Sequence, residues 1–118
     1  MAAPNLNSVS LTVNAAVDTV SPGSLSELTL KTNAAASGHT YITLSLTAAN
    51  NTASGVTIRV NWYDGTNNHR LLYDAVVPGN AQIECSPTRK LLLEGWTVKV
   101  TIGLANAIEF THHYLDCH

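Results

Sequence analysis

Apolar and polar side chains alternate most regularly in residues 56–63, VTIRVNWY, where every second position is apolar. A period of two is typical of a strand with one buried face, and it predicts that Trp62 faces the core. A second alternating run follows at 71–77. The residues between the runs, 64–68, are Asp, Gly, Thr and Asn, several of which favour turns. The two runs are therefore expected to form a long central hairpin.

Further strands are expected on both sides of this hairpin, because apolar residues again take every second position or form short apolar runs. Residues 96–102 and 108–114 are expected to form a second hairpin through the connection 103–107. In 108–114, the alternation places His112 on the same face as three apolar or aromatic residues. The other expected strands are 40–48, 82–85, the apolar run 91–93 and a short strand around Leu28 and Leu30.

No segment has a convincing helical period, so little or no helix is expected. The predicted strands recur at the spacing of a sandwich or barrel, with turn residues between them. A chain of 118 residues suits one domain. We therefore predict an all-β protein, an antiparallel β-sandwich of the jelly-roll or immunoglobulin-like kind.

The first third of the chain differs from the rest. Residues 1–37 contain no aromatic side chain and are rich in Ala, Asn, Ser and Thr. We expect this segment to be an N-terminal arm or a set of short strands, and residues 38–118 to form the sandwich core. A weak strand pattern is expected at Leu6, Val9, Leu11 and Val13.

Charged residues make up only 12% of the chain, against an average of about 25%. Thr, Ser and Asn replace them, which suits strand faces that are half exposed or packed against partners. The formal net charge of −2 gives no basic excess, so nucleic-acid binding is not expected. No apolar run approaches the roughly 20 residues of a membrane span, and the first ten residues do not resemble a signal peptide.

Potential metal ligands gather in residues 111–118, THHYLDCH. On a strand, His112, Asp116 and His118 would point one way, and His113 and Cys117 the other. This splits the ligands, so a site would need His39, His69 or a symmetry-related subunit as well. We expect no metal and no cofactor.

Catalytic signatures are equally sparse. The chain has no G-x-S-x-G elbow and no closely spaced pair of carboxylates, so we expect no enzymatic activity. Cys85 and Cys117 are too few for a disulfide scaffold; free thiols are favoured, although a single bond between them stays open.

Two tyrosines suggest a different kind of site. The alternation along each strand places Trp62 and Trp96 in the core. It places Tyr41 and Tyr63 on the outer faces of their strands, away from the core. Exposed tyrosines can stack on sugars, and with the loop 64–68 they would make a carbohydrate-binding platform. A carbohydrate-binding module is therefore an alternative function.

Several short motifs occur along the chain in the same order as in one group of proteins. They are Leu71-Leu72, Val77-Pro78-Gly79, Leu91-Leu92-Leu93-Glu94-Gly95, Ala105-Asn106-Ala107-Ile108 and Tyr114-Leu115. In this order the chain resembles the small β-sandwich accessory proteins of tailed-bacteriophage virions. The resemblance implies a structural role in the virion, assembled in the host cytoplasm, most concretely as a capsid decoration (cement) protein. A neck or tail accessory protein is the variant of the same class.

Such a protein would bind the major capsid protein or other virion proteins, and we expect it to act as a homotrimer. It would stabilise the capsid by bridging neighbouring subunits. The expected partner contacts are Leu6, Val9, Leu11 and Val13 in the N-terminal segment, with Tyr41 and Tyr63.

Overall fold

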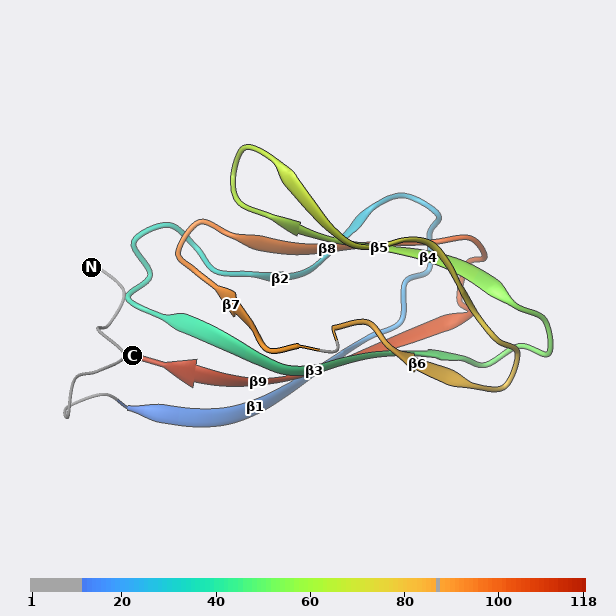
Figure 1. Ribbon diagram of the computed structural model, residues 1–118, viewed down its shortest axis with the longest axis horizontal. Helices are drawn as coiled ribbons and strands as arrows, with labels where there is room; N and C mark the ends of the chain where they lie inside the picture. The colour runs from blue at the N-terminus through green and yellow to red at the C-terminus, as the bar shows by residue number, and fades with distance from the viewer. Residues whose placement is uncertain (1–11, 87) are drawn as a thin grey trace.

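Two antiparallel sheets pack face to face in the computed structural model, which describes residues 12–86 and 88–118 (Figure 1). Sheet A has the strand order β1–β9–β3–β6, with β7 also pairing with β3, and sheet B has the order β2–β8–β4–β5. The described residues contain no helix, so they include no helix that could cross a membrane. This confirms the predicted all-β sandwich. The strands are β1 (Val13–Val20), β2 (Leu28–Thr32), β3 (Thr40–Asn50), β4 (Val56–Tyr63), β5 (Asn68–Val77), β6 (Gln82–Glu84), β7 (Lys90–Leu92), β8 (Thr97–Ile102) and β9 (Ile108–Cys117).

The core lies between the sheets and is built from the alternating apolar residues of both. Trp62 is only 3% exposed, as the sequence predicts, and its indole Nε1 donates to the carbonyl oxygen of Leu91 at 2.9 Å. That bond satisfies the buried N–H and ties sheet B to β7 of sheet A. The largest fully buried apolar side chains are Leu46, Ile58, Val60, Val77, Leu92, Val98, Val100, Ile108 and Phe110.

The predicted central hairpin is confirmed as β4 and β5, which pair from Val56–Val77 to Tyr63–Asn68. Its turn is stabilised by Asp64, whose Oδ1 accepts the backbone N–H groups of Thr66 and Asn67 at 2.8 and 2.7 Å. The strict alternation expected in 71–77 is wrong. Asp74 has a φ of 55°, and the register between β4 and β5 shifts in this region.

The expected second hairpin is also wrong. β8 lies in sheet B and β9 in sheet A, so the connection 103–107 carries the chain from one sheet to the other. Each of the two strands has one apolar face. In a sandwich these faces can pack against each other across the core, so the strands need not be neighbours in one sheet. The common inward face of β9 is confirmed, since Ile108, Phe110, His112 and Tyr114 are all buried.

In the N-terminal third, the strand around Leu28 and Leu30 is confirmed as β2, which pairs with β8. The first described strand, β1, pairs with β9 along its whole length, from Val13–Cys117 to Val20–Phe110. It begins where the expected pattern at residues 6–13 ends. Leu6, Val9 and Leu11 lie outside the described residues.

Asn33 holds the loop between β2 and β3. It is fully buried, and its side-chain amide donates to the carbonyl oxygens of His39 at 2.8 Å and Leu92 at 2.9 Å. A buried amide with two partners fixes the path of the backbone, because leaving either bond unmade is costly. His39, directly before β3, is thereby fixed against β7.

Candidate interaction surface

The outer face of sheet A carries apolar side chains at adjoining positions of four strands. Ala15, Leu115, Ile42 and Leu91 form a row across β1, β9, β3 and β7, each being the Cα partner of the next. Paired residues in an antiparallel sheet project to the same side, so the four side chains adjoin. We define the apolar face as this row together with two further exposed apolar residues of the same sheet, Val17 and Leu44.

Four of these six side chains are exposed, and those of Ile42 and Leu115 are partly buried. Val17 is 55% exposed, Leu91 44% and Leu44 38%. Single exposed apolar residues are normal on a protein surface, but a contiguous group marks an interaction site. The apolar face is therefore the strongest candidate for a surface that contacts another molecule.

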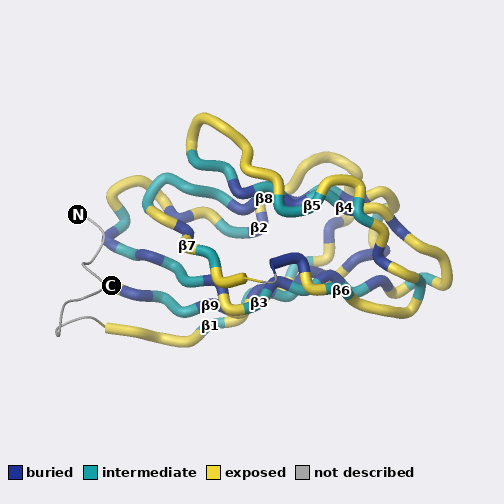
Figure 2. The backbone as a smooth tube through the Cα atoms, viewed as in Figure 1, coloured by how far each residue is buried: buried dark blue, intermediate teal, exposed yellow. Residues whose placement is uncertain are grey.

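The edge strand β1 contributes to this face, and none of its eight residues is buried: five are exposed and three are intermediate (Figure 2). Its sequence, VNAAVDTV, has no proline, lysine or arginine, the residues that commonly protect an edge from pairing with another chain. Its one charged residue, Asp18, is turned toward Lys31 of β2, with Oδ2 3.4 Å from Nζ. The outer side of β1 thus carries Val13, Ala15, Val17 and Thr19 with no charge among them.

The outer face of sheet B has the opposite character. Arg59 Nε donates to Asp74 Oδ1 at 2.7 Å, and Lys99 Nζ lies 4.0 Å from the ring centre of Tyr63. The hydrogen bond with Asp74 raises the pKa of Arg59 and lowers the pKa of Asp74. Apart from the exposed Val76, this face has the charged and hydroxyl side chains of an ordinary solvated surface. The two outer faces of the sandwich therefore differ in chemistry.

The structure separates the two tyrosines singled out in the sequence. Tyr63 lies on the outer face of sheet B, where its hydroxyl donates to the carbonyl oxygen of Gly65 at 2.9 Å. Tyr41 belongs to sheet A and packs against the core, with its ring 5.4 Å from that of Tyr114. The two do not form a common platform, and their role in partner contact stays a prediction.

The expected exposed position of Tyr41 is wrong because of a β-bulge. The register of β3 against β9 shifts between Thr43 and Ser45. An extra residue reverses the parity of the strand, so Tyr41 and Thr43 point to the same side as Leu46. Thr43 and Leu46 are both fully buried.

The histidines of the C-terminal segment have different surroundings. His112 is fully buried and its Nε2 lies 2.8 Å from Thr43 Oγ1. Burial lowers the pKa of His112 to about 4, because a buried imidazolium loses its hydration. His113, two positions from Leu115 on β9, is exposed and is the Cα partner of Val17.

The remaining histidines each meet a carboxylate. His69 Nε2 lies 2.8 Å from Asp64 Oδ2 in the β4–β5 hairpin. His39 Nδ1 lies 2.6 Å from Asp116 Oδ1, and His118 Nδ1 lies 3.6 Å from the same oxygen. The sequence indicated that a metal site in the C-terminal segment would need His39, His69 or a symmetry-related subunit. In the structure, His39 lies beside Asp116 of this segment.

Both cysteines are free and buried, as the sequence favoured. Desolvation raises the pKa of the Cys85 thiol to about 12, and the nearby charge of Glu84 adds to the effect. A thiol with so high a pKa is a poor nucleophile near neutral pH.

Comparisons with protein-family models, with curated proteins and with solved structures give no match for this chain.

Proposed function

We propose that this protein is a structural component of a bacteriophage virion, most concretely a capsid decoration protein. It binds neighbouring capsid subunits through the apolar face of sheet A and the adjoining edge of β1. The observation that carries this proposal is the row of apolar side chains on the outer face of sheet A, Ala15, Leu115, Ile42 and Leu91, flanked by exposed Val17 and Leu44. The resemblance of the sequence motifs to virion accessory proteins points to the same class.

The physical basis of such binding is removal of apolar surface from water. Burial contributes about 25 cal/mol per Å² of apolar surface, and the centre of an interface is depleted in charged residues. Ala15, Val17, Leu44 and Leu91 are the exposed members of the apolar face that a partner would cover. The polar face of sheet B would then remain toward solvent.

The edge of β1 supplies a second kind of contact. One side of β1 pairs with β9, and among residues 12–86 and 88–118 its other side has no neighbouring strand in sheet A. A partner strand can hydrogen-bond to such an edge, which adds directional contacts to the non-directional apolar ones. Three copies arranged around a symmetry axis would present the same edge to three capsid subunits, in keeping with the proposed trimer.

A neck or tail accessory protein would use the same surface on a different virion partner. The carbohydrate-binding alternative receives less support, since Tyr41 and Tyr63 lie in different sheets and face different sides. The proposal therefore centres on a protein partner.

The test is cosedimentation with capsid shells assembled from the major capsid protein of the genome that encodes this chain. The variant Val17→Glu/Leu91→Glu places two charges on the apolar face, and we expect it to bind at least tenfold more weakly than the wild type. The matched control Thr57→Glu/Thr101→Glu adds the same charges to the outer face of sheet B. The control is expected to bind like the wild type.

Absence of wild-type cosedimentation would contradict the capsid assignment, and equal losses in the two variants would contradict the assignment of the face. Light scattering on the purified protein gives the absolute mass in the same samples. We expect the mass of a trimer.

A further inference from the structure

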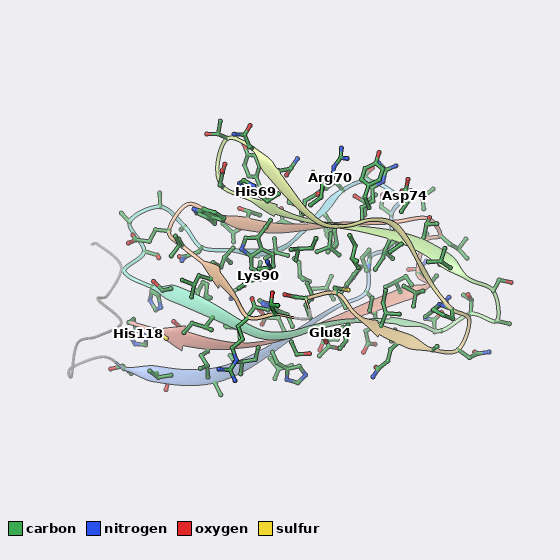
Figure 3. All side chains as sticks on the ribbon, in the orientation of Figure 1. His69, Arg70, Asp74, Glu84, Lys90 and His118 are labelled. Atoms are coloured by element: carbon green, nitrogen blue, oxygen red, sulfur yellow. The ribbon has the colours of Figure 1, made fainter. Side chains whose placement is uncertain are left out.

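Three potential metal ligands converge at the end of the sandwich where β3 begins and β9 ends. His39 directly precedes β3, and Asp116 lies in β9. His118, labelled in Figure 3, follows β9. One ligand atom from each, the two imidazole nitrogens and one carboxylate oxygen, all lie within 4.8 Å of one another. The two imidazole rings have their centres 4.6 Å apart.

We propose that His39, Asp116 and His118 bind a divalent transition-metal ion, with Zn²⁺ as the best match. Imidazole nitrogen and carboxylate oxygen are both zinc ligands, with bond lengths of about 2.0–2.2 Å. Ligand atoms around a tetrahedral ion are therefore separated by roughly 3.3 Å. The present separations of 2.6 and 3.6 Å from Asp116 Oδ1 bracket this value, so small side-chain rotations complete the site.

The backbone that carries the ligands is fixed on each side. The N–H of His39 donates to Ser37 Oγ at 3.1 Å, and its carbonyl oxygen accepts from the amide of Asn33. His118 exchanges two backbone hydrogen bonds with Thr12, at 2.8 and 2.9 Å. Because the main chain is held, binding would require ordering of side chains alone, which lowers its entropic cost.

The same chain contains a histidine–carboxylate pair that lacks this arrangement. Asp64 uses one carboxylate oxygen for His69 and the other for the backbone N–H groups of Thr66 and Asn67. Its carboxylate is thus committed to the hairpin turn, and the hydrogen bonds from the turn lower the pKa of Asp64 to about 2. Among the described residues, the group that meets the geometry of three ligands is the one at His39, Asp116 and His118.

The site is accessible to an ion from solution. The side chains of His39, Asp116 and His118 are 32%, 24% and 39% exposed. Three protein ligands leave the fourth position of a tetrahedral ion for water or for a donor from another molecule. Cu²⁺ and Ni²⁺ would also bind, because imidazole suits both ions. A bound ion would join the start of β3 to the end of β9.

Isothermal titration of chelator-treated protein with ZnCl₂ tests the site. We expect one Zn²⁺ per chain, with affinity falling at least tenfold in His118→Ala and in His39→Ala. Asp116→Asn keeps a hydrogen-bond acceptor for His39 but removes the charge, and it should also weaken binding. The matched control is His69→Ala, which removes the histidine of the other pair and should leave affinity within twofold of the wild type.

A thermal readout guards against variants that merely fold poorly. Saturating Zn²⁺ should raise the Tm of the wild type and of His69→Ala by about 5 °C or more, and should raise the Tm of His118→Ala clearly less. No heat of binding in the wild type would overturn the proposal, as would equal losses in His118→Ala and His69→Ala. Capsid cosedimentation is measured separately, so failure of the metal site and failure of the proposed function are distinguishable.

Discussion

The ammonium group of Lys31 donates a hydrogen bond to the hydroxyl of Tyr114 at 2.9 Å, joining the two sheets at one edge of the sandwich. Lys31 lies on β2 of sheet B and Tyr114 on β9 of sheet A. The ammonium also lies 4.6 Å from the ring centres of both Tyr41 and Tyr114. Desolvation alone would lower the pKa of Lys31, but the bond to Tyr114 and the charge of Asp18 outweigh it, so the pKa is raised.

Replacing Lys31 by Met should therefore destabilise the protein. The apolar stem is kept, but the buried Tyr114 hydroxyl and Asp18 lose their partner, which should cost about 1–2 kcal/mol of the free energy of unfolding. Chemical denaturation measures this cost. The control Lys99→Met removes a lysine whose ion pair with Glu27 is long, at 3.9 Å, and should cost about 0.5 kcal/mol or less. Equal costs for the two variants would contradict the role of the bridge.

Stability should fall as the pH falls from about 6.5 toward 4, because of His112. Burial lowers the folded-state pKa of His112 to about 4, whereas an unfolded histidine titrates near 6.5. The unfolded chain therefore takes up the proton first, and the stabilising contribution is complete only above the unfolded pKa. Asp18 raises this pKa slightly, and Lys31 and His113 lower it. Linkage gives a loss of about 2 kcal/mol between pH 7 and pH 5.

The double variant Thr43→Val/His112→Leu isolates this effect. It replaces both members of the buried hydrogen bond by apolar side chains of similar size and removes the unpaired Nδ1 atom of His112. Denaturant midpoints at pH 7 and pH 5 should then differ less for the double variant than for the wild type. A wild type whose stability is the same at both pH values would contradict the buried neutral histidine.

Cys85 should be nearly unreactive in the folded protein. With a pKa of about 12, its thiolate fraction at pH 8 is far below that of an ordinary cysteine, and the residue is only 1% exposed. In a Cys117→Ser background, reaction with a thiol reagent at pH 8 should be at least about 100-fold slower in the native state than in denaturant. Comparable rates in the two states would show that the thiol is not enclosed.

Gly79 occupies a position with no space for a side chain. A Cβ atom there would lie 2.2 Å from the carbonyl oxygen of Ala53, a contact with rigid backbone. Gly79→Ala should lower the free energy of unfolding by about 2–3 kcal/mol, measured by denaturation. The control Gly23→Ala meets its nearest neighbour at 3.4 Å and should change stability by less than about 1 kcal/mol.

Period-two alternation predicted the strands whose pairing is regular. The inward faces of β4 and β9 followed from it directly, including the burial of Trp62 and His112. Alternation could not show the bulge between Thr43 and Ser45, because an inserted residue changes parity without changing composition. Nor could it show which sheet a strand joins, and so β8 and β9 were expected to pair.

The candidate surfaces depend on this same long-range information. The apolar face is made by the pairing of β1, β9, β3 and β7, which are far apart in the chain. The sequence showed that potential metal ligands gather near the C-terminus, but it did not show which residues come together in the fold. His39 joins Asp116 because Thr40 is the Cα partner of Cys117 in the register of β3 against β9, and no local pattern encodes that register.

The turn of the β4–β5 hairpin rises from sheet B on the side away from sheet A (Figure 1). Gly65, Thr66 and Asn67 at its tip are exposed. In the proposed assembly, with the apolar face against a partner, this tip would point away from that partner. A side chain introduced at Thr66 would therefore be displayed on the side opposite the proposed contact, while the backbone hydrogen bonds from Thr66 and Asn67 to Asp64 keep the turn in place.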